Sequence, residues 1–311
     1  MKFLVTGGAG FIGSNITEAL VEKGEEVRVI DNLSTGKKEN LEPFLDKIEF
    51  IEGPEGDLCD IEVAKKAVEG VGYIFHEAAL PSVPRSVRDP ISSNNANVSG
   101  TLNLLCAARD AGVKRLVYAS SSSVYGESPV LPKKEDMSSE PLSPYAVSKL
   151  AGELYCKAFY RVYGLETVSL RYFNVFGPRQ DPSSQYAAVI PKFIKAMLKK
   201  ENPFIYGDGT QTRDFTYVEN VVNANLLAIE SRDAVGKVFN ISYGSSRSIN
   251  QLVKSLNKIL GENIKSKYEK ERPGDIMYSR GDISSAENIL GYRPKVSLEE
   301  GLKKTVDWFS K

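Results

Sequence analysis

The sequence of 311 residues predicts an α/β fold: a parallel sheet with helices on both faces, and a smaller C-terminal lobe. Two observations lead to this prediction. Short apolar runs alternate with helical patterns through the first half of the chain, and strands separated by helices form parallel sheets with right-handed crossovers. A glycine-rich turn also joins the first strand to the first helix, which is typical of a Rossmann-type sheet.

The first strand, turn and helix form one recognisable unit. An apolar strand at residues 3–5 precedes Thr6-Gly7-Gly8-Ala9-Gly10-Phe11-Ile12-Gly13, and apolar residues recur at helical spacing from Ile12 to Leu20. The glycine spacing is one residue wider than the common Gly-x-Gly-x-x-Gly. Glycines allow a tight turn, the approach of a pyrophosphate and close packing of helix on strand, and the helix N-terminus attracts phosphates. We therefore expect a dinucleotide here, bound by Gly7, Gly10, Phe11, Ile12 and Gly13.

The end of the second strand indicates which dinucleotide binds. A strand at residues 27–30 ends in Asp31, roughly 20 residues beyond the glycines. A carboxylate at this place can accept hydrogen bonds from both ribose hydroxyls and would repel a 2′-phosphate. The sequence thus favours NAD over NADP.

The remaining elements of the first half continue the alternation. We expect strands at residues 48–51, 73–75, 115–118 and 167–170, and helices at residues 61–68, 98–111 and 144–163. Ligands of such sheets bind at the carboxyl ends of the strands.

After about Phe173 the alternation becomes less regular. A polar loop at residues 178–186 precedes a helix at 187–199 and a short strand at 203–206, and a helix at 218–229 with a strand at 238–241 returns to the sheet. Beyond residue 248 we expect a helix, a strand, a loop and a final helix at 298–309. This predicts a dinucleotide-binding domain of residues 1–173 with about 218–245, and a second lobe of residues 174–217 and 246–311.

Composition excludes several classes of function. Lysine plus arginine and aspartate plus glutamate number 40 each, so we expect no nucleic-acid partner. The cysteines Cys59, Cys106 and Cys156 have neither disulfide nor metal-site spacing, and we expect no metal. No apolar run approaches the ~20 residues of a membrane span, and no signal peptide is recognisable. We expect a cytoplasmic protein without a membrane partner.

A tyrosine and a lysine indicate the chemistry. Tyr145 and Lys149 are four residues apart on the helix expected at 144–163, so they share one face. Tyrosine is a poor base at a pKa of about 10, but a nearby ammonium group and a nicotinamide cation favour the phenolate. Ser121, Ser122 and Ser123 follow a strand end, where a hydroxyl can bond the same substrate oxygen. Together these groups predict removal of a proton from a carbinol while a nicotinamide accepts the hydride.

These motifs resemble, along essentially the whole chain, those of the extended short-chain dehydrogenase/reductases, specifically nucleotide-sugar epimerases of the UDP-glucose/UDP-N-acetylglucosamine 4-epimerase type. Besides the glycine turn, the matching stretches are Asp31-Asn32-Leu33-Ser34-Thr35-Gly36, Gly56-Asp57-Leu58, His76-Glu77-Ala78-Ala79, Asn97-Val98-Ser99-Gly100-Thr101, Ser121-Ser122-Ser123-Val124-Tyr125-Gly126, Pro144-Tyr145-Ala146-Val147-Ser148-Lys149, Leu170-Arg171-Tyr172-Phe173-Asn174-Val175-Phe176-Gly177-Pro178, Arg213-Asp214-Phe215 and Arg272-Pro273-Gly274-Asp275.

The resemblance implies the rest of a tightly bound, recycled NAD site. The implied contacts run from adenosine to nicotinamide: Asp31, Asn32 and Gly36 at the ribose, Asp57 and Leu58 at the adenine, Ala78, Ala79 and Asn97 along the inner half, and Tyr172 by the nicotinamide. The joint at residues 52–57 is longer than usual, so Glu52 remains a weaker alternative to Asp57.

The resemblance also implies a UDP-sugar site in the second lobe. The implied contacts are Asn174, Arg213 and Arg272 with the diphosphate, Ala188 and Val189 with phosphate or uridine, Tyr206 with uracil and Asp275 with a ribose hydroxyl. Ser279 would border the C2 substituent of the sugar, where a small residue leaves room for an N-acetyl group. The segment at Ser82 and residues 180–192 also resemble the group that prefers N-acetylated sugars.

The implied reaction is 4-epimerisation of a UDP-hexose through a 4-keto intermediate, with Ser121, Tyr145 and Lys149 as catalytic residues. UDP-GlcNAc and UDP-GalNAc are the expected substrates, with UDP-glucose and UDP-galactose as further candidates. A nucleotide-sugar dehydratase, reductase or decarboxylase on the same fold remains an alternative, although a 4,6-dehydratase usually has Asp-Glu where this chain has Ser122-Ser123. A regulator that binds NAD without turnover would be expected to lose Tyr145 or Lys149. We expect His76 to be structural, and a homodimer through a four-helix interface.

Overall fold

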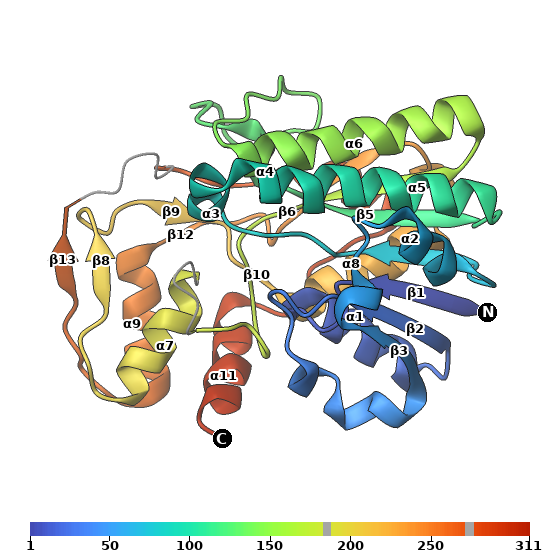
Figure 1. The fold of residues 1–311 in the computed structure, drawn as a ribbon. Helices are drawn as coiled ribbons and strands as arrows, with labels where there is room; N and C mark the ends of the chain where they lie inside the picture. The colour runs from blue at the N-terminus through green and yellow to red at the C-terminus, as the bar shows by residue number, and fades with distance from the viewer. Residues whose placement is uncertain (183–187, 271–276) are drawn as a thin grey trace.

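A seven-stranded sheet forms the centre of the computed structural model, which describes residues 1–182, 188–270 and 277–311. All its strand pairs are parallel, in the order β11-β6-β5-β4-β1-β2-β3 (Figure 1). The strands are β1 (Lys2–Thr6), β2 (Glu26–Asp31), β3 (Ile48–Glu52), β4 (Tyr73–His76), β5 (Arg115–Ser121), β6 (Glu166–Tyr172) and β11 (Val238–Ile241). The order reverses between β1 and β4, where doubly wound sheets bind their ligands.

Helices cover both faces of the sheet, as predicted. Along β1, Leu4 faces one core while Phe3 and Val5 face the other, because successive side chains of a strand point to opposite faces. The core around Leu4 contains α2 (Ile61–Val68), α5 (Gly100–Asp110) and α6 (Pro144–Tyr163). The core around Phe3 and Val5 contains α1 (Phe11–Glu22) and α8 (Val218–Glu230), and the two sets of helices lie on opposite sides of the sheet in Figure 1.

A second group of elements packs at the end of the molecule away from β1–β3 (Figure 1). Its helices are α7 (Val189–Leu198), α9 (Ile249–Leu260) and α11 (Leu298–Phe309), whereas α10 (Ser284–Leu290) packs on β11 and α8 of the main domain. Three small sheets accompany them: β7 (Val175–Phe176) with β10 (Thr216–Tyr217), β9 (Thr212–Arg213) with β12 (Arg247–Ser248), and β8 (Phe204–Tyr206) with β13 (Lys267–Glu269). Phe193 of α7, Leu252 of α9 and Leu302 of α11 belong to the same apolar core as α1 and α8.

The helix expected at residues 98–111 begins earlier and in pieces. It comprises α3 (Val83–Arg88), α4 (Pro90–Asn94), a π-helical turn at Asn95–Ser99 and α5. Pro84 and Pro90 fall in first helical turns, where no backbone N–H is needed, and the side chains of Ser82 and Asp89 cap them. The prolines obscured the helical pattern in the sequence because they usually end helices.

Smaller differences concern ends and short turns. Helix α7 begins at Val189, not at residue 187, which lies outside the described residues, and α10 has no counterpart among the predicted elements. Short 3₁₀ turns lie at Lys38–Asn40, Glu42–Lys47, Gly53–Gly56, Ser122–Tyr125 and Arg232–Ala234. In the described part of the chain, no helix has the length and apolar character needed to cross a membrane.

Candidate active site

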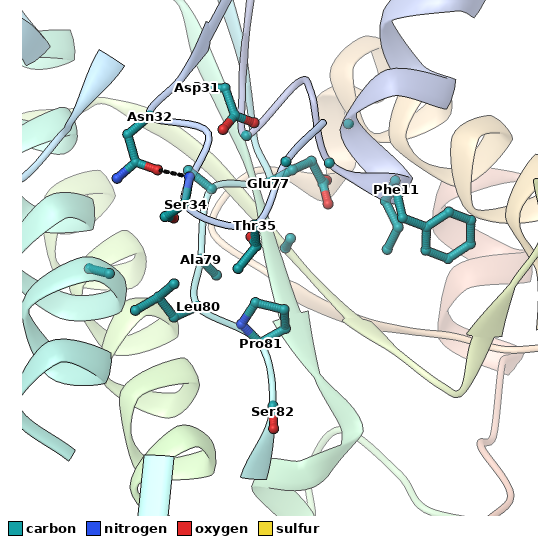
Figure 2. A pocket seen from close by; sticks show the side chains of 18 of the residues that line it. Phe11, Asp31, Asn32, Ser34, Thr35, Glu77, Ala79, Leu80, Pro81 and Ser82 are labelled. Atoms are coloured by element: carbon teal, nitrogen blue, oxygen red, sulfur yellow. Dashed lines mark hydrogen bonds between the residues drawn. The ribbon is translucent and has the colours of Figure 1, made fainter. Parts of the chain in front are cut away.

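A cavity of about 830 Å³ lies at the carboxyl ends of the central strands (Figure 2). Most of the residues predicted to bind the cofactor line it: Gly7, Gly10, Phe11, Ile12, Gly13, Asp31, Asn32, Gly36, Asp57, Leu58, Ala78, Ala79, Tyr145, Lys149 and Tyr172. They come from five strand ends and from α6, so residues far apart in sequence meet at one edge of the sheet.

The glycine turn has no room for side chains. Gly7 has a φ of +64°, and a Cβ there would lie 2.7 Å from the Cα of Ala78. A Cβ on Gly13 would collide with the carbonyl oxygen of Gly7. Helix α1 begins at Phe11 without a side-chain cap, which leaves its first N–H groups for a ligand. These observations fit a dinucleotide diphosphate.

Asp31 organises the loop that follows β2. Its Oδ2 accepts a hydrogen bond from the N–H of Ala9 at 3.0 Å, and its Oδ1 accepts one from Leu33 at 2.8 Å. Burial raises the pKa of this carboxyl group, and the backbone hydrogen bonds oppose the rise. Figure 2 shows Asn32, Ser34 and neighbours on the same side of the cavity, with the Asn32 side chain accepting from the N–H of Ser34 at 3.0 Å.

The long joint after β3 forms the 3₁₀ turn Gly53–Gly56, which delivers Asp57 to the cavity. Asp57 Oδ1 accepts a hydrogen bond from the N–H of Cys59 at 3.0 Å. Glu52, the weaker candidate, forms an ion pair with Lys38 at 2.6 Å and is not among the lining residues.

Tyr145 and Lys149 reach the cavity from the first turns of α6, whose N-terminus is capped by Ser143. Burial raises the pKa of Tyr145 to about 12, and a hydrogen bond with Ser121 lowers it in part. Lys149 Nζ donates to the carbonyl oxygen of Ala119 at 2.8 Å, and burial lowers its pKa to about 8. Burial and the charge of Glu77 both raise the pKa of Tyr145, and the lowering expected from Lys149 together with a nicotinamide cation stays a prediction for the cofactor-bound protein.

The three serines lie behind Tyr145. Ser121 ends β5, and Ser122 and Ser123 begin the 3₁₀ turn Ser122–Tyr125. Ser123 Oγ donates to Ser121 Oγ at 2.9 Å. None of the three is among the described residues that line the cavity, so Ser121 reaches it through its hydrogen bond with Tyr145.

A buried ion pair holds the catalytic helix against the sheet. Glu153, one turn beyond Lys149, accepts hydrogen bonds from Arg171 Nε at 2.9 Å and from its second guanidinium nitrogen at 2.8 Å. Ser120 also donates to this carboxylate. The contact ties α6 to β5 and β6, directly below the catalytic residues.

Asn97 was expected to line the inner half of the cofactor site and instead lies buried behind its wall. Its Oδ1 accepts from the N–H of Leu80 at 2.7 Å, and its Nδ2 donates to Ser148 Oγ at 3.0 Å. Leu80 itself lines the cavity. Asn97 thus shapes the wall through the backbone of Leu80.

A second cavity of about 300 Å³ adjoins the first, and Ala188 lines both. Its lining includes the predicted substrate residues Asn174, Val189, Tyr206 and Arg213. Ser82 lines the first cavity.

Ser279 is linked to the second cavity through Asn174, whose Nδ2 donates to Ser279 Oγ at 3.4 Å. Buried Asp214 holds the segment that follows, because it accepts hydrogen bonds from the N–H groups of Gly281 and Tyr243 at 3.2 and 3.0 Å. Arg272 and Asp275 lie outside the described residues.

The sequence motifs did not single out several of the lining residues, most of them charged or polar, although Gln180, Asp181 and Lys192 lie in the segment 180–192 that resembles the N-acetyl-preferring group. They are Glu77, Arg85, Arg88, Arg179, Gln180 and Asp181 in the first cavity and Lys192, Phe204 and Gln211 in the second. Glu77 lies inside a motif that was recognised, next to Ala78, and its position at the end of β4 was the available signal.

Residues 178–181, here called the clasp, run from the second group of elements to the mouth of the first cavity. Arg179 donates two hydrogen bonds to Glu18 of α1, at 2.9 and 2.8 Å. Asp181 forms an ion pair with Lys37 at 3.2 Å, and Asn15 donates to the carbonyl oxygen of residue 178 at 3.4 Å. Because Lys37, Arg179 and Asp181 all line the cavity, the clasp spans its rim.

Glu77 lies on the floor of the same cavity, directly after β4. The hydroxyl of Tyr172 donates to Glu77 Oε1 at 2.8 Å, and Asn225 Nδ2 donates to that hydroxyl at 2.8 Å. Burial raises the pKa of Glu77 to about 7.

His76 has a structural role, as predicted. Its two ring nitrogens are hydrogen-bonded to the hydroxyls of Thr6 and Thr101, at 2.7 and 2.8 Å. Burial lowers the pKa of this ring to about 3, so it stays neutral and joins β1, β4 and α5.

Comparisons with known proteins agree with this geometry. Residues 3–242 match the model of the NAD dependent epimerase/dehydratase family. The UDP-glucose 4-epimerase of Mycolicibacterium smegmatis is 40% identical over 313 residues, which cover 99% of this chain and 98% of that protein.

Two solved structures share the whole fold. The UDP-N-acetylglucosamine 4-epimerase from Methanobrevibacter ruminantium, in complex with UDP-N-acetylmuramic acid, has a TM-score of 0.94 and 46% identity, over 99% of this chain and 98% of that one. The UDP-glucose 4-epimerase of Thermotoga maritima with UDP-glucose has a TM-score of 0.95 and 43% identity, over 100% of this chain and 99% of that one.

Proposed function

This chain belongs to the NAD-dependent epimerase/dehydratase family, and we propose that it interconverts the C4 epimers of a UDP-hexose, with UDP-GlcNAc and UDP-GalNAc as its main substrates. UDP-glucose and UDP-galactose are further candidate substrates. The observation that carries the proposal is the hydrogen-bonded pair Tyr145–Ser121 at a dinucleotide-sized cavity that adjoins a second, smaller one.

The residues of the first cavity fit NAD. The glycine turn leaves space for a diphosphate, and Asp31 lies where the adenosine ribose is expected. We assign the inner end of the cavity, with Tyr145, Lys149 and Tyr172, to the nicotinamide. When bound, NAD takes a hydride from C4 of the sugar and returns it, so the net redox change is zero.

Tyr145 moves the proton in both halves of the reaction. As a phenolate it accepts the proton of the 4-hydroxyl, and it returns that proton to the same oxygen after the keto sugar has turned over. Ser121 bonds this oxygen and lowers the tyrosine pKa, and the cationic nicotinamide supplies the further stabilisation that the protein alone lacks.

The sugar must turn while its nucleotide stays bound, so most of the binding energy should lie in the UDP site. We assign that site to the second cavity, with Asn174, Val189, Tyr206 and Arg213 at its walls and Ala188 at the junction. Arg272 and Asp275 are proposed as further contacts with the diphosphate and ribose. A guanidinium group suits a diphosphate because it donates in a fixed fork.

The same assignment supports two domains, of residues 1–173 with about 218–245 and of residues 174–217 with 246–311. The described lining of the first cavity comes mainly from the former range, and that of the second cavity from the latter.

We also propose a homodimer. Large apolar side chains are exposed on the neighbouring helices α3, α4 and α6, among them Ile91 at 73% and Leu154 at 60%. A second copy that covers this face would pair α6 across the interface, whereas the four-helix interface expected from the sequence pairs the helices at residues 98–111 and 148–163.

The test is turnover without added cofactor. Purified protein is incubated with UDP-GlcNAc and the products are separated by chromatography; we expect UDP-GalNAc. Tyr145→Phe should retain the nucleotide and lose on the order of 10²–10⁴ in rate. Cys106→Ala, at a half-buried position of α5 outside both cavity linings, is the matched control and should turn over normally.

The possible outcomes test the substrate preference and the reaction type separately. Conversion of UDP-glucose but not UDP-GlcNAc would contradict the assignment of Ser279 and leave the mechanism intact. Binding of UDP without conversion of either sugar would contradict the epimerase assignment and point to a decarboxylase or another reaction of this fold.

A further inference from the structure

The carboxylate of Glu77 is placed at the reacting end of the cofactor cavity. It follows β4, whose neighbours β1 and β5 carry the glycine turn and Ser121, and it is one of the lining side chains labelled in Figure 2. Tyr145, Lys149 and Tyr172 line the same cavity. A hydride can pass only between a nicotinamide and a carbon next to the catalytic hydroxyl, so the nicotinamide must lie near Tyr145, at this end.

The position of the carboxylate is fixed by neighbours from two other elements. Tyr172 of β6 donates to it, and Asn225 of α8 donates to the Tyr172 hydroxyl in turn, both at 2.8 Å. Tyr172 and Asn225 are both buried, so the groups that hold the Glu77 carboxylate are themselves fixed in the core.

The charged and titratable groups that face Glu77 are few. Lys149 and Tyr145 of α6 both feel its charge, which favours the lysine ammonium and disfavours the tyrosine phenolate. Tyr118 of β5 and Tyr172 of β6 are the other titratable groups within range, and the adjacent His76 is neutral. The charge of Glu77 raises the pKa of Tyr145 and so disfavours the phenolate that acts as the base. Its presence at the site therefore calls for another role than activation of Tyr145.

We propose that Glu77 sets the redox balance of the bound nicotinamide by stabilising its oxidised, cationic form. The oxidised ring carries a positive charge and the reduced ring is neutral, so a nearby carboxylate in a region of low dielectric favours the oxidised state. In an epimerase this keeps the resting cofactor oxidised and shortens the time during which a keto sugar can escape. The inference rests on the proposed function, since it requires NAD at this end of the cavity.

The test needs no sugar. The holoenzyme is treated with sodium cyanoborohydride, and the near-ultraviolet absorbance of the reduced nicotinamide is followed, with rates normalised to free NAD under the same conditions. Glu77→Gln keeps the shape and removes the charge, and we expect its bound NAD to be reduced roughly five- to tenfold faster than in the wild type. Glu135→Gln is the matched control, because Glu135 is also a partly buried carboxyl group with a raised pKa, lies outside both cavity linings and should leave the rate unchanged.

Glu77→Asp separates charge from packing. It keeps the carboxylate and shortens the side chain that Tyr172 contacts, so its reduction rate should lie much closer to that of the wild type than the rate of Glu77→Gln does. Equal rates in Glu77→Gln and wild type, or the full increase in Glu77→Asp, would overturn the proposal.

A measurement on the wild type keeps the proposal testable if Glu77→Gln does not yield holoenzyme. Protonation of Glu77 removes its charge, so the normalised reduction rate should rise as the pH falls through neutrality. A rate that is independent of pH would overturn the proposal. Because turnover of UDP-GlcNAc is measured separately, failure of the epimerase assignment is distinguishable from failure of this one.

Discussion

Single residues decide the substrate range that we propose. Ser279 contacts Asn174, a residue of the second cavity, and we propose that its small side chain leaves room beside the sugar C2 position. Ser279→Tyr should reduce kcat/KM for UDP-GlcNAc at least tenfold, because the phenol ring would occupy the space of the N-acetyl group. The measurement is a comparison of kcat/KM for UDP-GlcNAc and UDP-glucose.

The control for this variant is Ser284→Tyr, at the exposed start of α10 outside both linings, which should leave both substrates unaffected. An equal loss on UDP-glucose and UDP-GlcNAc in Ser279→Tyr would show general disruption and contradict the assignment.

The single histidine should give the protein a measurable sensitivity to acid. His76 has a pKa of about 3 when folded and 6.5 when unfolded, so between these values the unfolded chain binds more protons. The free energy of unfolding therefore falls as the pH falls, and His76 alone accounts for about 2 kcal/mol between pH 7 and pH 5. Urea denaturation at these two pH values measures it.

In His76→Gln this component of the pH dependence should disappear, although the variant is less stable overall. Carboxyl groups with raised pKa values, such as those of Glu77 and Asp214, act in the opposite direction in both proteins, so the difference between the two slopes is the quantity to compare. Identical slopes would mean that the ring is protonated in the folded state.

At the scale of elements, the clasp should govern how long the cofactor stays bound. Arg179 is buried and makes two hydrogen bonds to Glu18, whereas the pair Lys37–Asp181 is largely exposed and should contribute little. Glu18→Gln should therefore weaken the contact by about 1 kcal/mol, which corresponds to a several-fold faster loss of NAD. The measurement is the cofactor content after extended dialysis.

Lys65→Ala, in an exposed ion pair on α2, is the control for nonspecific loss of charge and should retain the cofactor like the wild type. If the dialysis half-time of Glu18→Gln equals that of the wild type, the clasp does not limit cofactor release.

The elements also show what the sequence could predict. The strands and the helix of Tyr145 and Lys149 follow from apolar periodicity and from a spacing of four residues, and the sheet confirms them. Helices α3 and α4 were not predicted because proline usually ends a helix. Pro84 and Pro90 instead lie in the first turns of these helices, where proline is tolerated. The pair Glu153–Arg171 escaped as well, since nothing local marks two charges on different elements as partners.

The placement of side chains within the site was only partly predictable. Residues of the glycine turn line the cavity as expected, because their role is carried by the backbone. Asn97 and Ser121 lie next to the cavity, as expected, but neither lines it directly. Asn97 accepts a hydrogen bond from the backbone of Leu80, and Ser121 is hydrogen-bonded to Tyr145. Glu77 was missed because its importance depends on Tyr172 and Lys149, which come from other strands and helices.

For the whole molecule, the proposed homodimer gives a direct prediction. Leu154→Glu places a charge on the exposed apolar face of α6 and should shift the protein from dimer to monomer, because buried unpaired charges are costly. Light scattering coupled to size exclusion measures the mass. Lys254→Glu, exposed on α9 and away from this face, is a control for added negative charge. A wild-type protein that elutes as a monomer at micromolar concentration would contradict the proposal.

The clasp also has a consequence for how the protein matures. Arg179 and Glu18 are 161 residues apart in the chain, so the rim of the cavity closes only after both halves of the polypeptide have been synthesised and folded. Before that moment the nascent N-terminal half offers an open binding surface, and afterwards exchange requires the rim to separate. The time at which the nucleotide binds, before or after the two halves meet, therefore decides whether its entry requires the rim to open.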